Sequence, residues 1–228
     1  MPLFDFHTHT TISDGHAAPL VMARRCLENG YGAYVCSDHV DEASVERRVP
    51  EIVAACREVE RELDLPAIPA VEVTRVAPER VAVVAARARS LGALLVVVHG
   101  ETLGDFPQPG LNLAAARCPD VDILGHPGLI SNQAAEAARE NGIHLEISAA
   151  GLHGLTNGHV TKVAVSLGAH LVLDSDAHRP EALLTAQRAQ NLLEGSGLDI
   201  EAALRVAESA PLRILARRGI AISQRAAS

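Results

Sequence analysis

Aromatic residues are scarce in this sequence: Phe, Trp and Tyr make up 2% of the 228 residues, and tryptophan is absent. The chain also lacks a basic excess, because its formal net charge is −8. Proteins that bind nucleic acid broadly use basic stripes and stack bases on aromatic rings. We therefore expect no nucleic-acid partner. Part of the acidic excess would be neutralised if carboxylates held cations.

Cysteine pairs and long apolar runs are also missing. None of the four cysteines lies in a CxxC pair, which argues against zinc-finger and redox motifs. We expect buried, reduced thiols in a cytoplasmic protein. The apolar run "LGALLVVV" is far too short to span a membrane, and no basic stretch followed by an apolar run predicts a signal peptide.

Short apolar runs alternate with longer, alanine-rich amphipathic segments. Seven such alternations predict an α/β fold with a parallel sheet or barrel, in a single domain over residues 1–228. The expected strands lie near residues 2–6, 33–37, 67–72, 94–98, 121–125, 143–147 and 171–175. The expected helices lie near residues 17–29, 44–63, 78–91, 131–141, 157–167, 180–194, 199–208 and 211–218.

Ionisable residues follow the predicted strands at their C-terminal ends. In barrels and open α/β sheets, active sites are built at this end. The residues concerned are His7, His9, Asp38, His39, Glu72, His99, Glu101, His126, Glu146, Asp174, Asp176 and His178.

The spacing of these residues favours metal binding. Residues i and i+2 of a strand share a face, so His7 and His9 can hold one cation together, as can Asp176 and His178. A single pair of this kind is more often packed and hydrogen-bonded in the core than bound to a metal. A series of such residues at corresponding strand ends is hard to explain in that way. Burying so many ionisable groups without partners would be costly. Imidazole and carboxylate without thiolate suit Zn²⁺, Mn²⁺ or Fe²⁺, and we predict a multinuclear site.

Several segments resemble the motifs of the PHP family, named for polymerase and histidinol phosphatase domains. They are "FHTHTTISDG", "SDH", "VE", "VVHGE", "ILGHP" and "DSDAH", and they run from His7 to His178. "HGET", "DILGHPGLI" and "LTNGHV" are similar to the small stand-alone, histidinol-phosphatase-like members. The resemblance implies a distorted (β/α)7 TIM-like barrel with three divalent metal ions.

The resemblance also implies the ligands of each ion. One ion would be held by His7, His9, Glu72 and Asp176, a second by Asp14, His39 and His178, and a third by Glu72, His99 and His126 with Glu72 bridging. Asp14 and His16 compete for one position near the "SDG" turn. The commoner form of this turn favours Asp14, which leaves His16 either as a substrate contact or as a residue that supports a ligand.

The glycine-rich loop "GLHGLTNGHV", residues 151–160, precedes a predicted helix. Asn157 and His159 can reach a substrate phosphate there, aided by the amides of the helix start. An Asn helix cap beside a surface His explains the segment equally well. Arg179 can bind phosphate bidentately, although a surface salt bridge explains it more simply.

Other ionisable residues are expected to have supporting roles. Glu146 is predicted to support the cluster, and Asp174 to be a partner behind Asp176. Asp38 points away from its neighbour along the strand and is interpreted as structural. His144 and His170 lie at strand starts and are not expected to be ligands.

Together, these features predict a metal-dependent phosphoric ester hydrolase that attacks a small phosphomonoester with a metal-bridging hydroxide. Histidinol phosphate and nucleotides are candidate substrates, and Glu72, Asp176 and His178 are the expected catalytic residues. No Ser or Cys lies in a setting diagnostic of a nucleophile. Two alternatives stay open: a metallohydrolase acting on an amide or lactone, and a non-catalytic PHP module.

Overall fold

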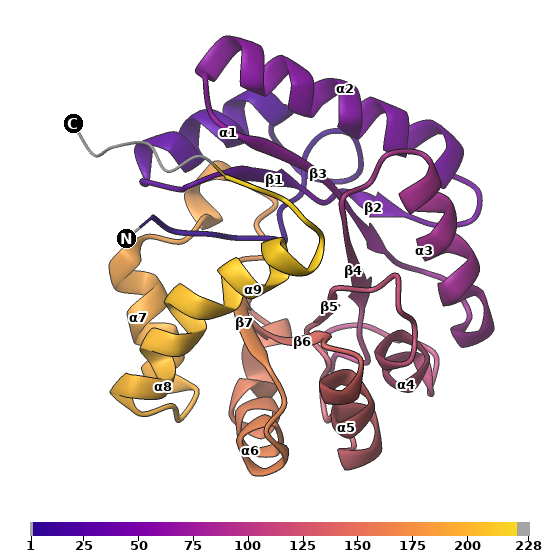
Figure 1. Ribbon diagram of the computed structural model, residues 1–228, viewed down its shortest axis with the longest axis vertical. Coiled ribbons are helices and arrows are strands. Elements are labelled where there is room, and N and C mark those ends of the chain that lie inside the picture. The colour runs from indigo at the N-terminus through magenta and orange to yellow at the C-terminus, as the bar shows by residue number, and fades with distance from the viewer. Residues whose placement is uncertain (1, 223–228) are drawn as a thin grey trace.

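The centre of the molecule is a parallel β-sheet with helices around it (Figure 1). The structure is a computed structural model in which residues 2–222 are described. The strands follow the order β1-β3-β4-β5-β6-β7, and β2 pairs with β3. Their bounds are β1 Tyr34–Cys36, β2 His39–Val40, β3 Ala67–Val73, β4 Leu95–His99, β5 Ile123–Gly125, β6 His144–Ser148 and β7 Leu171–Asp174.

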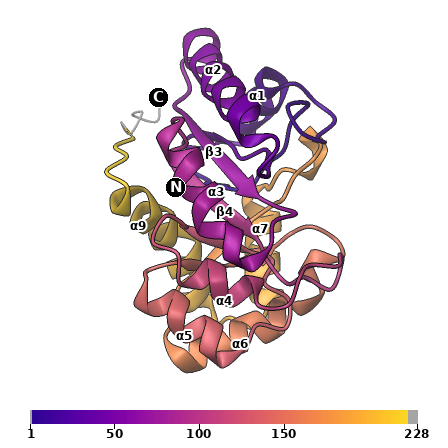
Figure 2. The ribbon, with the colours of Figure 1, turned by 90° about the vertical axis from the view of Figure 1, so that its right-hand side faces the viewer.

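Helices connect successive strands and cover the outside of the sheet. Figure 2 shows α4, α5 and α6 together on one side of the molecule, with α1 and α2 at the opposite end. The helices are α1 Pro19–Glu28, α2 Val45–Leu63, α3 Val81–Ser90, α4 Leu111–Ala116, α5 Asn132–Glu140, α6 Asn157–Leu167, α7 Ala186–Gly195, α8 Ile200–Leu204 and α9 Ala210–Arg217. None of the helices within residues 2–222 combines the length and apolar composition needed to span a bilayer.

Residues 2–9 close the ring between its two ends. Leu3 makes a parallel bridge to Tyr31, ahead of β1, and Thr8 makes one to Ala177, after β7. This segment takes the place of a strand between β7 and β1 and so closes the barrel. The fold is therefore the distorted (β/α)7 TIM-like barrel that we expected.

The expectation of a regular first strand near residues 2–6 was wrong. Side chains replace the backbone ladder here, because Phe6 N–H donates to the Asp174 carboxylate at 2.6 Å and Thr8 N–H donates to Ser37 Oγ at 2.8 Å. A strand whose amides bind side chains keeps its direction but loses the regular pattern of ladder hydrogen bonds.

The other differences concern short elements. The turn-rich segment after β4 leads directly into α4, which we did not predict. The helix expected near 180–194 begins only at Ala186, because Pro180–Ala182 forms a 3₁₀ turn and the Thr185 side chain caps the helix. A π-helical turn, Arg205–Ser209, interrupts the helix expected near 199–208.

The apolar core has two layers. One lies between the strands and the outer helices and includes all four cysteines, which are buried and form no disulfide. The other fills the barrel interior with residues such as Phe6, Val97 and Ile123. Ile214 and Leu215 of α9 belong to this inner layer, so α9 covers the end of the barrel where the strands begin. The opposite end is left for polar side chains.

Candidate metal centre

All nine predicted metal ligands converge at the C-terminal ends of the strands. His7 and His9 come from the closing segment, Glu72 from β3 and His99 from the last position of β4. The others begin β2, follow β5 and β7 or lie in the loop before α1. They are Asp14, His39, His126, Asp176 and His178.

Glu72 lies at the middle of the cluster and is completely buried. Its Oε2 atom is 3.4 Å from His7 Nε2, 3.6 Å from His9 Nε2 and 2.5 Å from His39 Nδ1. Its Oε1 atom is 3.0 Å from His99 Nδ1 and 3.5 Å from His126 Nε2. One carboxylate thus faces five imidazoles, which is the position a bridging ligand requires.

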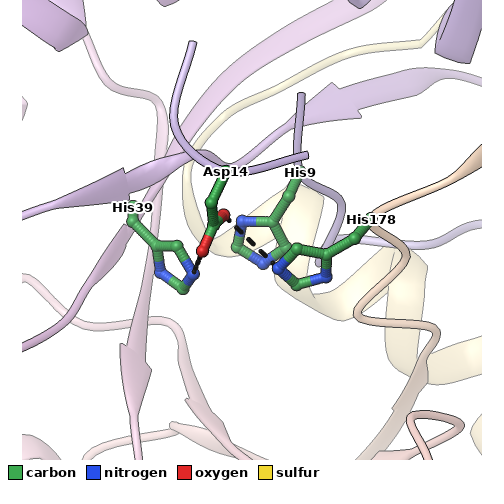
Figure 3. A group of neighbouring side chains, drawn as sticks. All are labelled: His9, Asp14, His39 and His178. Atoms are coloured by element: carbon green, nitrogen blue, oxygen red, sulfur yellow. Dashed lines mark ion pairs between the residues drawn. The ribbon is translucent and has the colours of Figure 1, made fainter. Parts of the chain in front are cut away.

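A second carboxylate joins the other side of the cluster. Asp14 Oδ2 lies 3.3 Å from His39 Nε2, and Asp14 Oδ1 lies 3.4 Å from His178 Nε2. Figure 3 shows Asp14 between these two rings, with His9 beside them. These four side chains can offer their ligand atoms to one ion. His16 is exposed and belongs to no such group within residues 2–222.

Three further groups within the described chain can each hold an ion. They consist of His7, Glu72 and His126; of His7, His9 and Asp176; and of His126, His153 and Asp176. In every group the ligand atoms lie within 4.8 Å of one another. Because neighbouring groups share His7, His9, His126 or Asp176, ions bound in them would be close neighbours.

Several buried polar atoms in the cluster lack hydrogen bonds. His7 Nε2, His9 Nε2 and Glu72 Oε2 make none of ordinary geometry, although they approach one another within 4 Å. Native proteins leave few buried polar atoms unpaired. Convergent imidazole and carboxylate atoms without thiolate fit a divalent transition-metal ion, so the side chains present fit the cofactor that the sequence predicts.

Burial and neighbouring charges act in opposite directions on the pKa values of the cluster residues. Burial disfavours the charge on His7, but Glu146, Glu72 and Asp176 outweigh it and raise the pKa of His7 well above its usual value. Burial would likewise raise the pKa of Glu72, but His39 and His7 hold that pKa well below its usual range. The pKa of His9 is lowered by burial and by neighbouring His39. Bound cations would replace the shared protons that balance these charges.

Residues behind the cluster orient its ligands. Glu146 Oε2 is 2.7 Å from His7 Nδ1, which leaves the other nitrogen of His7 directed at Glu72. A carboxylate in this position fixes the tautomer and direction of a ligating imidazole. Asp5, which precedes the strand end and so falls outside the predicted pattern, accepts hydrogen bonds from the amides of His7 and Ser175, and burial raises its pKa to about 6.

The loop that carries Asp14 is held by Asp38. The Asp38 carboxylate accepts hydrogen bonds from the amides of Thr10 at 2.8 Å and Ser13 at 3.0 Å, and from both hydroxyls. Asp38 is therefore structural, as the sequence indicated. Gly15 is required for the tight turn, because a Cβ atom there would lie 2.5 Å from the His9 carbonyl carbon.

Two cluster residues have backbone conformations that L-amino acids rarely adopt. His126 has φ 26° and Asp176 has φ 53°. Positive φ at residues other than glycine is concentrated at functional sites, where the surrounding structure holds the chain in a less favourable conformation. Gly125 precedes His126, and a side chain there would contact His7 and Glu146 at 3.3 Å.

Two residues near the cluster were missed as site residues. His153 lies in the glycine-rich loop, where its Nε2 atom is 3.8 Å from Asp176 Oδ2 and its ring stacks on His126 at 4.2 Å. Asp105 reaches within 3.6 Å of His99 Nε2 from an exposed loop. Neither follows its strand directly, so the strand-end pattern could not distinguish them from surface residues.

The predicted substrate contacts are not gathered around the cluster in the same way. The Asn157 side chain bonds both the N–H and the carbonyl of Ser148. His159 Nε2 lies 2.9 Å from the Ile130 carbonyl, and Arg179 is exposed. The backbone N–H of His16 donates a hydrogen bond to the His178 carbonyl at 2.8 Å. Substrate contact by these four residues stays a prediction.

Comparison with solved structures supports the architecture. A chain of archaeal ribonuclease P, in a structure with mature tRNA, superposes with TM-score 0.70 over 97% of each chain at 15% identity. Aspergillus niger ochratoxinase gives TM-score 0.53 over 93% of this chain and 71% of the other, at 15% identity. Arabidopsis N6-mAMP deaminase gives 0.50 over 82% and 59%, at 14% identity. These identities show similarity of fold alone.

Comparison with known sequences identifies the relatives of the chain. No family model matches it. Uncharacterized protein MJ1295 of Methanocaldococcus jannaschii is 36% identical over 196 residues, which span 86% of this chain and 90% of that protein. At this identity and coverage, the chain belongs to the same protein family as MJ1295.

Proposed function

We propose that this protein is a metal-dependent phosphoesterase of the PHP type, acting on a small phosphomonoester. The observation that carries the proposal is the position of Glu72, whose two carboxylate oxygens face five imidazoles within 3.6 Å. The nine residues that the resemblance to that family implies as ligands are all side chains of this cluster, which supports the proposal. Zinc, manganese and iron are the candidate ions, since the ligands are imidazole and carboxylate.

The side chains divide into an inner and an outer set. His7, His9, Glu72, His126 and Asp176 are buried and would hold ions. Divalent ions in such a centre acidify water and polarise phosphoryl oxygens.

Asp14, His153 and His178 form the open side, with side-chain exposures of 47%, 23% and 33%. A substrate phosphate would therefore approach along this side. Burial lowers the pKa of His178, but Asp14 outweighs this and raises that pKa above its usual value.

The loops beside this opening support a small substrate with an apolar part. Leu103, Phe106, Leu152 and Leu155 are at least half exposed, on the loops that follow β4 and β6. The two loops touch, since Thr102 Oγ1 and His153 Nδ1 are 2.6 Å apart. Histidinol phosphate and nucleotides both combine a phosphate with a ring that such side chains can contact.

The test is phosphate release from a panel of phosphomonoesters and nucleotides. Chelated protein is reloaded with Mn²⁺ or Zn²⁺, and His9→Ala is compared with Gln187→Ala, which changes an exposed residue of α7. We expect metal-dependent release that His9→Ala abolishes and Gln187→Ala preserves. Absence of release from every compound, by protein shown to contain metal, would refute the proposal.

The similarity to a ribonuclease P chain suggests a second candidate, a protein component of a ribonucleoprotein. The net charge of −8 opposes it, because RNA binding draws on basic side chains. Tight RNA binding by a protein that releases no phosphate would favour this candidate. Metal-dependent cleavage of amides or lactones without phosphate release would favour a different metallohydrolase.

A further inference from the structure

A hollow of about 280 Å³ lies at the end of the barrel opposite the metal centre. Residues from the end of α6, the start of β7, α8, the π-helical turn and α9 line it. Figure 1 shows α9 beside β7, with α6 and α8 farther out on the same side of the molecule. Most of the lining residues are apolar, with Leu198 and Val206 among the larger side chains.

The polar lining of this hollow is entirely basic or imidazole. It consists of His144, His170, Arg205 and Arg213, and no Asp or Glu is among the lining residues. Arg205 already pairs with Glu201 at 2.5 Å. Within residues 2–222, Arg213 makes no ion pair, and its Nη1 atom only approaches His170 Nδ1 at 3.5 Å. Arg213 is exposed, and within these residues its guanidinium has no anionic partner.

His144 is the unusual residue of the group. It is 3% exposed, and neither of its ring nitrogens makes a hydrogen bond. Its ring stacks on His170 at 5.2 Å. His144 shares with Glu146 the face of β6 that points into the barrel, because side chains alternate along a strand. A buried imidazole without a partner costs folding free energy unless something else supplies one.

The electrostatic setting agrees with this geometry. Burial, with the positive fields of His170 and Arg213, lowers the pKa of His144 to about 3. A backbone contact with Gly142 opposes these influences and favours the protonated ring. The same two influences, burial and Arg213, lower the pKa of His170. Both imidazoles are therefore neutral near pH 7, and the positive charge of the hollow comes from Arg205 and Arg213.

We propose that this hollow binds a small organic anion, with its carboxylate or phosphate at His170 and Arg213 and its apolar part against Leu198 and Val206. The anion would partner Arg213 and offset the positive field at His144. The site lies at the other end of the strands from the metal centre, so the inference does not depend on the proposed phosphoesterase activity. The π-helical turn that supplies Arg205 and Val206 is a type of element often found at functional sites.

The test uses hexanoate as the probe and the full, metal-loaded chain. Imidazole signals are followed by NMR, and those of His144 and His170 are assigned from single His→Gln variants. We expect hexanoate to shift both signals with one dissociation constant. Arg213→Met should weaken binding by about tenfold or more, because it removes a charge-assisted contact. Arg57→Met, which changes an exposed arginine of α2, should leave binding unchanged.

Hexanol separates the anionic group from the apolar body. Equal binding of hexanol and hexanoate would overturn the proposal, since the hollow would then be only an apolar one. So would shifts confined to His9 and His178, which would place the carboxylate at the metal centre. Unchanged affinity in Arg213→Met, or no shift of His144 and His170 at all, would also overturn it.

Discussion

At the residue scale, Glu146 fixes the orientation of the His7 ring, and therefore which ring nitrogen faces a bound ion. Its carboxylate lies 2.7 Å from His7 Nδ1, and both side chains are fully buried. Glu146→Gln keeps the size of the side chain but removes the charge. We expect it to lower metal affinity by about 10- to 100-fold, as loss of such a partner typically does. Competition with a metal-binding dye measures this affinity without reference to activity.

Glu140→Gln is the matched control, because Glu140 lies on the exposed surface of α5. It should leave metal affinity unchanged. Equal affinity of Glu146→Gln and the unsubstituted chain would show that His7 is oriented by packing alone.

The low pKa of His144 predicts how the folding stability of the protein depends on pH. Its pKa is about 3 in the folded chain, against 6.5 for an ordinary histidine, so the unfolded chain binds its proton first as the pH falls. The stability that depends on a neutral His144 is therefore present above pH 6.5 and is lost progressively toward pH 3, by at most about 1.4 kcal/mol per unit. Urea unfolding from pH 7 to pH 5 measures this loss.

His144→Leu removes the titrating group while keeping an apolar side chain. The variant should lose less stability between pH 7 and pH 5 than the unsubstituted chain. Parallel loss in the two proteins would mean that His144 is not held neutral in the folded state.

At the element scale, α9 is fixed to the barrel by a buried carboxylate. Asp122, just before β5, is 1% exposed and pairs with Arg217 at 3.1 Å, with Arg218 at 2.5 Å and with Arg89 of α3. Asp122→Ala leaves three guanidinium groups without their partner. We expect it to destabilise the fold by about 3 kcal/mol, near the lower end for a buried pair because the arginines keep some exposure.

Denaturant unfolding measures this effect. Glu62→Ala is the control, since its pair with Arg61 is exposed and should contribute less than about 1 kcal/mol. A similar loss in both variants would show that α9 is held by its apolar contacts in the barrel interior rather than by Asp122.

At the scale of the whole molecule, metal binding should stabilise the entire barrel. The ligands come from the closing segment, from several strands and from the loops after β5 and β7, so an ion joins parts of the chain that separate on unfolding. A ligand at 100 times its dissociation constant contributes about 2.7 kcal/mol. For a chain of this length that corresponds to a rise in Tm of roughly 5–10 °C.

Thermal unfolding of chelated and zinc-loaded protein tests this expectation. His9→Ala should reduce the rise, because His9 belongs to two of the possible metal groups, whereas Gln187→Ala should not. An equal rise in both variants would place the bound zinc outside the cluster.

The sequence by itself determined the barrel and most of the side chains of its candidate metal centre. Apolar runs that end in His, Asp or Glu specify strands whose C-terminal ends meet, and that alone brings His99, His126 and Asp176 together. The alternation of side chains in "HTH" places His7 and His9 on one face. Both inferences rest on local periodicity, which the chain carries without reference to its fold.

Only the tertiary structure decided the rest. His153 and Asp105 reach the cluster from loops, whose paths depend on contacts between distant segments such as that of Thr102 with His153. The first strand lost its regular ladder because side chains of Asp174 and Ser37 took its amide hydrogen bonds. The positive hollow near His144 exists because α9 folds back beneath β6 and β7. No local pattern encodes these contacts, since each depends on where the rest of the chain has packed.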